Sequence, residues 1–140
     1  MAADLALLKP KVRALAKELI SLCQQFGCPI LIIQTFRTIA EQDALYAKGR
    51  TAPGKIVTRA KGGSSLHNYG VAFDFAPLVD DRPNWKQLDL FDKVGVMGEG
   101  LGLEWGGRWK KFNDLPHFQL CMGYRLKDFQ SGKIDESKWA

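Results

Sequence analysis

The most informative stretch of the sequence for the fold is Ser65-Leu66-His67-Asn68-Tyr69-Gly70-Val71-Ala72-Phe73-Asp74. Its second half alternates, because Val71 and Phe73 are bulky and apolar whereas Ala72 is small and Asp74 is charged. Side chains two residues apart lie on the same face of a strand. The pattern therefore predicts a strand over 71–76 with one apolar face and a second face from which Asp74 projects between small neighbours.

The chain has only two histidines, and each lies near an acidic residue at a predicted strand border. His67 precedes Asp74, and His117 follows Asp114 at the start of a second predicted strand over 117–121. Two imidazoles and one carboxylate are a sufficient set of protein ligands for a catalytic zinc ion. The pattern therefore predicts a Zn²⁺ site formed by His67, Asp74 and His117, although the same donor set also serves non-haem iron.

Two further charged residues are candidates for catalysis. A catalytic zinc ion lowers the pKa of a bound water to about 7, so a nearby carboxylate can take up its proton. Asp114, held close to His117 by Pro116, is the candidate base, and a turn-capping role is the competing interpretation. Arg37 can stabilise a developing oxyanion or clamp a substrate carboxylate, with a surface salt bridge as its alternative.

Three residues are candidate substrate contacts. Ser65 either hydrogen-bonds the substrate or a ligand, or shapes the loop before His67. Trp105 and Trp109 flank two glycines and are placed to form the floor of a substrate groove. Ordinary aromatic packing is the competing role, and it is the expected one for at least one of the two tryptophans.

The N-terminal part of the chain predicts a helix followed by a strand. Apolar residues recur at steps of three and four over 5–26, which is the spacing of one core-facing helix surface that ends at Gly27. Pro10 is expected in the first turn of this helix. The β-branched run Ile30 to Ile33 then predicts a buried strand that leads to Arg37.

A capping box begins the next predicted element. Thr38 and Glu41 have the T-x-x-E spacing that starts a helix, and this helix is expected to run through Tyr46 and stop at Gly49. Residues 50–65 are rich in Gly, Ser, Thr and Lys and lack apolar periodicity, so they predict a long loop. Loops of this length in compact domains are often functional.

The rest of the chain mixes helices and strands. Asn84 and Gln87 indicate a capped helix that runs towards Gly100, and residues 103–109 indicate a strand with a tight turn. The tail after residue 123 is predicted to be one short helix and a surface end. Helices and strands alternate without a regular βαβ rhythm, which favours an α+β fold.

Length and composition fit a single domain over 1–140. A chain of 140 residues with 46% hydrophobic content can bury one core, and we expect it to act as a monomer. No stretch approaches the roughly 18 uninterrupted apolar residues of a membrane span. The N-terminus also lacks the pattern of a signal peptide, so unaided export and stable membrane insertion are not expected.

Charge and cysteine content restrict the partners and the compartment. The net charge of +5 predicts attraction to polyanions, including the acidic polymers of a bacterial envelope. Lys and Arg are scattered and no nucleic-acid-binding motif is present, so we expect no nucleic-acid partner. Cys23, Cys28 and Cys121 form no CxxC pair, which predicts three free thiols in a reducing compartment.

Eight matching segments give the chain a resemblance to the M15 metallopeptidases, which include D-Ala-D-Ala carboxypeptidases, VanX-type dipeptidases and phage endolysins of the L-alanyl-D-glutamate endopeptidase type. The segments are Phe36-Arg37, Glu41-Gln42, Leu45-Tyr46-Ala47-Lys48-Gly49-Arg50, Pro53-Gly54, Val57-Thr58, the Ser-x-His-x-x-Gly-x-Ala-x-Asp motif over 65–74, Trp105-Gly106-Gly107 and Asp114-x-x-His117-Phe118.

The resemblance implies a small antiparallel sheet flanked by helices, as in Hedgehog and D,D-peptidase domains. It also implies zinc on His67, Asp74 and His117, with Asp114 as base and Arg37 as electrostatic stabiliser. The stretch Leu-Tyr-Ala-Lys-Gly-Arg over 45–50 is most similar to the endolysin branch, and the dipeptidase branch typically has Glu at the position of Asp114. The resemblance therefore implies cleavage of the L-Ala–D-Glu bond of peptidoglycan.

The absence of a wall-binding domain and of a signal peptide fits a phage or prophage endolysin that stays in the host cytoplasm until a holin releases it to the wall. Three alternatives stay open. The same zinc chemistry can act on D-Ala-D-Ala ends, as a carboxypeptidase or dipeptidase. A zinc-containing module can bind wall peptides without catalysis. A basic nucleic-acid binder would show steeply salt-dependent binding to DNA without metal.

Overall fold

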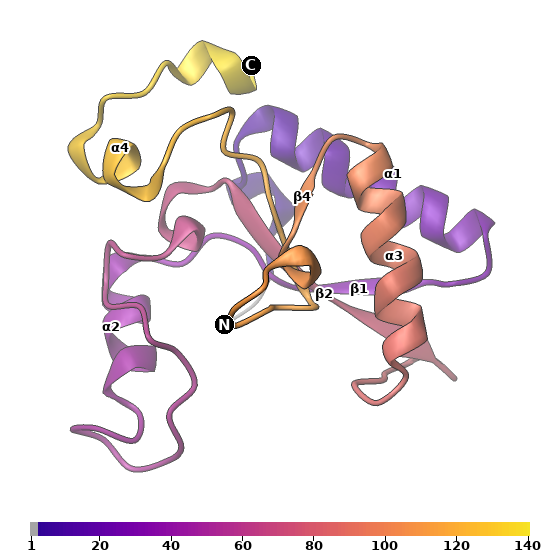
Figure 1. Cartoon of the computed structure of the whole chain (residues 1–140), viewed down its shortest axis with the longest axis horizontal. Coiled ribbons are helices and arrows are strands. Elements are labelled where there is room, and N and C mark those ends of the chain that lie inside the picture. The colour runs from indigo at the N-terminus through magenta and orange to yellow at the C-terminus, as the bar shows by residue number, and fades with distance from the viewer. Residues whose placement is uncertain (1–2) are drawn as a thin grey trace.

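An antiparallel sheet forms the centre of the computed structural model, which describes residues 3–140 (Figure 1). Four strands are neighbours in the order β1-β2-β5-β4, and a short strand, β3, pairs with the far end of β2. The strands are β1 (Ile30–Gln34), β2 (Ala72–Val79), β3 (Arg82–Pro83), β4 (Glu104–Trp105) and β5 (His117–Gln119). The predicted α+β fold with a small antiparallel sheet flanked by helices is confirmed.

Four α-helices surround the sheet: α1 (Pro10–Gln25), α2 (Ile39–Ala47), α3 (Leu88–Gly100) and α4 (Leu126–Ser131). Helices α1 and α3 contact each other on one side of the molecule, whereas α2 with its following loop and α4 lie on the other (Figure 1). The 3₁₀ helices are η1 (Leu5–Leu7), η2 (Leu66–Tyr69), η3 (Gly106–Arg108) and η4 (Glu136–Trp139). Between residues 3 and 140, no helix has the length and apolar character needed to cross a bilayer.

Helix α1 begins at Pro10, as predicted, and η1 forms the separate turn before it. The missing amide hydrogen of proline costs nothing at this position, where helix N–H groups have no partner. The buried side of α1 includes Val12, Leu19 and Cys23. The prediction that Phe26 completes this face is wrong, because α1 ends at Gln25 and the Phe26 side chain is 70% exposed.

Strand β1 is present where predicted, but it lies at an edge of the sheet and is only partly buried. Ile30 is buried, but Leu31 is 45% exposed. The strand pairs only with β2, so one of its edges and part of one face meet solvent.

The alternation predicted for β2 and β5 is confirmed by their register. Phe73 pairs with Phe118, and Asp74 pairs with His117. The rings of Phe73 and Phe118 are both fully buried, with centroids 5.5 Å apart. Each strand therefore buries a bulky apolar face on one side and carries a polar side chain, Asp74 or His117, on the other.

The predicted capping box of α2 is present, because the Thr38 side chain accepts from the Glu41 amide and the Glu41 carboxylate accepts from the Thr38 amide. The prediction for α3 is only half right. The Asn84 side chain accepts hydrogen bonds from the amides of Lys86 and Gln87 in the preceding turn, but the Gln87 side chain makes no capping hydrogen bond.

The C-terminal tail departs from its predicted surface position. Helix α4 is present, but the tail continues into η4, where Trp139 is completely buried and donates a 2.8 Å hydrogen bond from Nε1 to the Leu120 carbonyl. The prediction of free thiols is confirmed for Cys23, Cys28 and Cys121, all of which are buried. Burial raises the pKa of Cys23 and of Cys121 to about 12, so both are inert packing residues.

Candidate metal centre and active site

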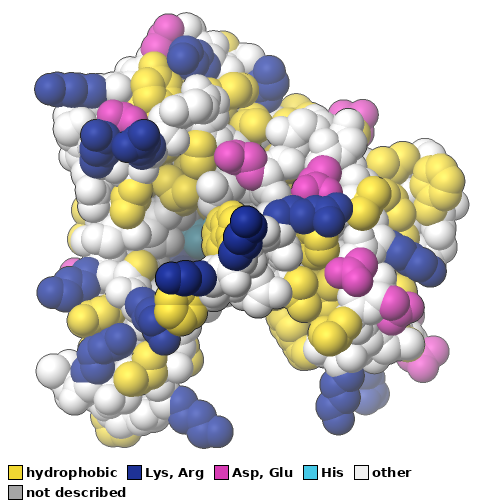
Figure 2. Space-filling view, in the orientation of Figure 1, with side chains coloured by type: hydrophobic (Ala, Val, Ile, Leu, Met, Phe, Trp, Pro, Cys, Tyr) yellow, Lys and Arg dark blue, Asp and Glu magenta, His cyan; other side chains and the backbone are white. Residues whose placement is uncertain are grey.

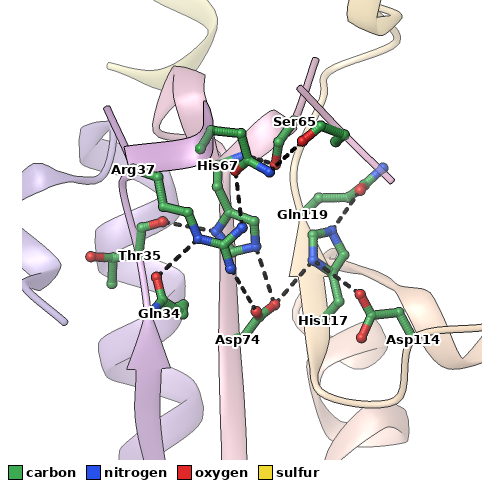
Figure 3. A network of polar contacts seen from close by, with 11 residues as sticks. Gln34, Thr35, Arg37, Ser65, His67, Asp74, Asp114, His117 and Gln119 are labelled. Carbon is green, nitrogen blue, oxygen red and sulfur yellow. Dashed lines mark hydrogen bonds and ion pairs between the residues drawn. The ribbon is translucent and has the colours of Figure 1, made fainter. Parts of the chain in front are cut away.

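Three separate elements bring the predicted ligands together (Figure 3). His67 lies on η2, Asp74 on β2 and His117 at the start of β5. Asp74 Oδ1 lies 3.3 Å from His67 Nε2 and 3.1 Å from His117 Nδ1. The three ligand atoms lie within 4.8 Å of one another, and both histidines are buried. The sequence thus predicted a cluster that the fold assembles.

Hydrogen bonds at the far side of each imidazole fix which nitrogen faces Asp74. His67 Nδ1 is 2.8 Å from the Thr35 carbonyl oxygen, which can only accept, so Nδ1 donates. His117 Nε2 donates to Gln119 Oε1 at 2.8 Å. The remaining nitrogens, His67 Nε2 and His117 Nδ1, then direct their lone pairs at the carboxylate.

This arrangement fits a metal ion. Two imidazole lone pairs and one carboxylate oxygen repel one another unless positive charge, from protons or from a metal, lies among them. An outer hydrogen bond that fixes the tautomer is the usual support of a metal-binding histidine. The donor set of two nitrogens and one oxygen is the chemistry expected for zinc.

Asp74 is ionised at neutral pH. Burial on its own would raise the pKa of this carboxyl group, but the close polar contacts with His117 and His67 outweigh burial and hold the pKa well below its usual range. Burial likewise would lower the pKa of His117, yet the contact with Asp74 raises it above the ordinary value. A deprotonated carboxylate is the form that binds metal.

Arg37 is a member of the site and not a surface ion-pair residue. Its side chain is only 14% exposed, and Nη2 lies 3.7 Å from Asp74 Oδ2. Its Nε donates to Gln34 Oε1 and its Nη1 to Gln42 Oε1, each at 3.1 Å. Burial lowers the pKa of Arg37, but a guanidinium remains charged at neutral pH. A fixed positive charge thus faces the ligand cluster.

Asp114 faces the same cluster from the segment before β5. Its Oδ2 lies 3.9 Å from His117 Nδ1, and its side chain is 46% exposed. Within residues 3–140 its carboxylate accepts no hydrogen bond from the backbone, so the turn-capping interpretation is not supported. Burial is the main reason that the pKa of Asp114 is raised, with the charge of Asp74 acting in the same direction.

Gly106 allows Asp114 to approach the cluster. The Asp114 amide donates to the Gly106 carbonyl at 2.9 Å. A Cβ on Gly106 would lie 2.5 Å from the Asp114 carbonyl oxygen and 3.2 Å from His117 Cβ. The absence of a side chain is therefore required where the two segments meet.

A cavity of about 330 Å³ contains the predicted machinery, since Arg37, His67, Asp74, Asp114 and His117 all line it. Its remaining walls are Ser65, Leu45, Val57 and Thr58.

The three candidate substrate contacts differ in position. Ser65 lines the cavity, and its Oγ also accepts from the His67 amide at 3.2 Å, so it shapes η2. Trp105 is 5% exposed and donates from Nε1 to the Leu115 carbonyl at 2.8 Å, outside the cavity, which makes it a packing residue. Trp109 is 39% exposed, and its ring centroid lies 5.2 Å from that of His117.

Sequence reasoning missed the polar residues that hold the site in place. Gln42 is fully buried and joins Arg37 to the long loop, because its Nε2 donates to the Ala60 carbonyl at 2.8 Å. Asn68 Oδ1 accepts from the Gly63 amide, and its Nδ2 donates to the Arg37 carbonyl. Strand alternation places Gln119 on the same face as His117, so the sequence could have indicated their contact. The sequence contains no signal for the hydrogen bond between His67 and the Thr35 carbonyl.

Comparison with known proteins gives matches across most of the chain. The M15 peptidase family model described as D-alanyl-D-alanine carboxypeptidase matches residues 58–120. The peptidoglycan L-alanyl-D-glutamate endopeptidase CwlK of Bacillus subtilis is 40% identical over 124 residues, which cover 81% of this chain and 73% of CwlK. The L-alanyl-D-glutamate peptidase of Listeria phage A118 is 30% identical over 128 residues, covering 89% of this chain and 42% of the phage protein.

Among solved structures, the D,D-pentapeptidase VanY of a VanB-type vancomycin-resistance cassette superposes with a TM-score of 0.62. That structure is a mutant in complex with Zn(II), and it covers 94% of this chain and 83% of VanY at 11% identity. At this identity the similarity establishes the fold.

Proposed function

This chain belongs to the M15 family of metallopeptidases, and we propose that it cleaves the L-Ala–D-Glu bond in the stem peptides of bacterial peptidoglycan. The observation that carries the proposal is the convergence of Arg37, Asp114 and the His67–Asp74–His117 cluster in one cavity. Relatives that are named for this bond, at 40% and 30% identity, support the choice of substrate.

Zinc is the metal we propose for the cluster of His67, Asp74 and His117. The donor set suits it, and the structurally similar VanY was solved with Zn(II). When bound, zinc supplies Lewis-acid chemistry, which polarises a carbonyl group and lowers the pKa of water to about 7.

Asp114 is the proposed proton carrier of the reaction. Its carboxylate is half-exposed in the cavity, so it can accept a proton from the attacking water. As the water oxygen bonds to the L-Ala carbonyl carbon and the C–N bond breaks, Asp114 returns the proton to the leaving amine of D-Glu. Arg37 faces the negative charge that develops on the carbonyl oxygen, a role that its buried, hydrogen-bonded guanidinium suits.

Hydrolysis of D-Ala-D-Ala ends is the second candidate function. The description of the family model and the likeness to VanY favour it. A role in lysis by a phage or prophage also stays a prediction, supported by the relative from Listeria phage A118.

Product analysis tests the proposal directly. Purified peptidoglycan is digested with the zinc-loaded protein, and the released fragments are assigned by mass spectrometry with end-group labelling. We expect new D-Glu amino ends and L-Ala carboxyl ends. Loss of terminal D-Ala would identify the second candidate instead, and no release at all would indicate a wall-peptide-binding module without catalysis. The Asp74→Ala variant, which lacks one ligand, is the inactive control.

A further inference from the structure

A second cavity adjoins the one that contains the histidines. Its volume is about 800 Å³, and we call it the outer groove. Val57, Thr58 and Asp114 line both cavities, so the two lie side by side and share part of their walls. Figure 2 shows a histidine at the bottom of a hollow, with Lys and Arg side chains gathered around its entrance.

Two segments distant in sequence form the walls of the outer groove. The long loop after α2 contributes Arg59, and the segment between η3 and β5 contributes Phe112. The guanidinium carbon of Arg59 lies 4.0 Å from the centroid of the Phe112 ring, so a cation–π contact joins the two walls.

Phe112 is held in an uncommon conformation. Its φ is +52°, a region that bulky side chains rarely occupy, and the ring is nevertheless 70% exposed. Such strain persists where surrounding structure imposes it, and it clusters at ligand-binding sites. Here the conformation places an apolar ring against Arg59 at the groove.

The guanidinium of Arg59 retains its hydrogen-bonding capacity. Within residues 3–140 its side chain makes no ion pair and no hydrogen bond, and its aromatic contact is the one with the Phe112 ring. The N–H groups of Arg59 have no partner among these residues, and the paired N–H groups of a guanidinium match the two oxygens of a carboxylate. Lys110 and Lys111, which directly precede Phe112 in the chain, are exposed and add positive charge to this segment.

The position of Asp114 determines which half of the substrate enters the outer groove. If Asp114 returns a proton to the leaving amine, the D-Glu half of the stem peptide must lie beside it. Asp114 lines the outer groove as well as the inner cavity. A D-Glu half that lies beside Asp114 can therefore extend into the outer groove. D-Glu continues the stem through one of its two carboxyl groups and keeps the other free.

We propose that Arg59, braced by Phe112, binds the free carboxylate of D-Glu and makes the protein select acidic over amidated stem peptides. This inference rests on the proposed function, because it assigns a subsite to that reaction. The competing role for Arg59 is that of a solvated surface cation, which would leave substrate choice unaffected.

The test uses two soluble stem peptides that differ only in whether the free carboxyl group of D-Glu is an acid or an amide. We expect kcat/KM of the unmodified protein to be higher for the acid by roughly tenfold or more, because the amide cannot form the charged hydrogen bond with Arg59. Arg59→Gln should lower kcat/KM for the acid to the level of the amide, through KM, and leave the amide unchanged. Arg59→Lys should show an intermediate kcat/KM for the acid, because lysine keeps the charge but lacks the paired N–H groups of a guanidinium.

Lys127→Gln, which removes an exposed cation on α4 outside both cavities, is the matched control and should retain the full preference for the acid. An unchanged ratio of acid to amide in Arg59→Gln would overturn the inference and leave the proposed function standing. Failure of the unmodified protein to cut the L-Ala–D-Glu bond would instead overturn the proposed function. In that case the affinities of both peptides, measured by calorimetry, test the role of Arg59. If the protein binds the acid more tightly than the amide and Arg59→Gln keeps this preference, Arg59 does not form the proposed subsite.

Discussion

Asp114 and the three proposed metal ligands lie within one cluster, but their substitution should have different consequences. Asp114→Asn keeps the shape of the side chain and removes its capacity to accept a proton. We expect this variant to fold and to retain zinc, while kcat on a soluble stem peptide falls by about 10²–10⁴-fold, the usual contribution of a general base. Steady-state kinetics and metal analysis of the purified variant measure the two quantities together.

His117→Ala is the reference variant for this measurement. It removes one of the three proposed ligand atoms, so it should lose both metal and activity. Near-normal turnover by Asp114→Asn would remove Asp114 as the base, and stoichiometric zinc in His117→Ala would refute the ligand assignment.

Gln119 should control metal affinity without touching the metal. Its Oε1 accepts the hydrogen bond from His117 Nε2 and so leaves Nδ1 as the ligand atom. We expect Gln119→Leu to weaken zinc binding by about 10–100-fold, the typical effect of losing such a partner, and to regain activity in excess zinc. Competition with a chromogenic chelator measures the affinity. Gln24→Leu, an exposed glutamine of α1, is the control, and equal affinity in both variants would contradict the role.

Much of the site was predictable at the scale of residues. Strand alternation alone placed Asp74 and His117 each on the polar face of its own strand, and the register of the folded sheet pairs the two residues directly. The hydrogen bond that orients the His67 ring was not predictable, because its acceptor is the backbone carbonyl of Thr35 and every residue has such a carbonyl. The role of Trp105 also depended on the fold, because only the packing of α3 shows what its indole contacts.

At the scale of elements, sequence periodicity located helices and strands better than it located their surroundings. The run Ile30 to Ile33 is apolar throughout, yet Leu31 is 45% exposed, because β1 has a partner strand on one side only. The same residues would suit a central strand. The number of neighbours of a strand is set by the topology, which local sequence does not encode.

Helix α3 carries a glycine that the packing of the sheet requires. A Cβ on Gly95 would overlap the indole of Trp105, which is buried and hydrogen-bonded and so cannot move aside easily. We expect Gly95→Ala to lower the free energy of unfolding by about 1–3 kcal/mol, the usual cost of overpacking a core. Urea denaturation followed by tryptophan fluorescence measures this change.

The control for Gly95 lies on the same helix. A Cβ on Gly100 would meet no atom within 4 Å, so Gly100→Ala should be neutral or stabilising by up to about 1 kcal/mol. Equal stability of the two variants would show that the contact between α3 and β4 is looser than the structure indicates.

At the scale of the whole molecule, the two ends of the chain are joined. Lys9, just before α1, forms a 2.7 Å ion pair with Glu136 of η4, and its ammonium lies 5.5 Å from the centroid of the Trp139 ring. Because Glu136 is 67% exposed, this ion pair contributes little to stability. Burial of the Trp139 ring stabilises the fold more, and the tail before it has too little periodicity to reveal where the ring packs.

Trp139 should therefore be essential for stability although it lies next to the last residue. Its ring is completely buried, with centroids 6.0 Å from Tyr124 and 5.8 Å from Phe129, and its Nε1 satisfies the Leu120 carbonyl directly after β5. Trp139→Ala removes these contacts and leaves that carbonyl without its partner. We expect a loss of about 3–5 kcal/mol in the free energy of unfolding, measured by urea denaturation.

Trp85→Ala separates the effect of position from that of removing a large ring. Trp85 is 51% exposed beside β3, so its removal should cost much less than that of Trp139. If Trp139→Ala costs no more than Trp85→Ala, the tail does not close the core. If it costs several kcal/mol, part of the stability that holds β5, and with it His117, comes from the end of the chain.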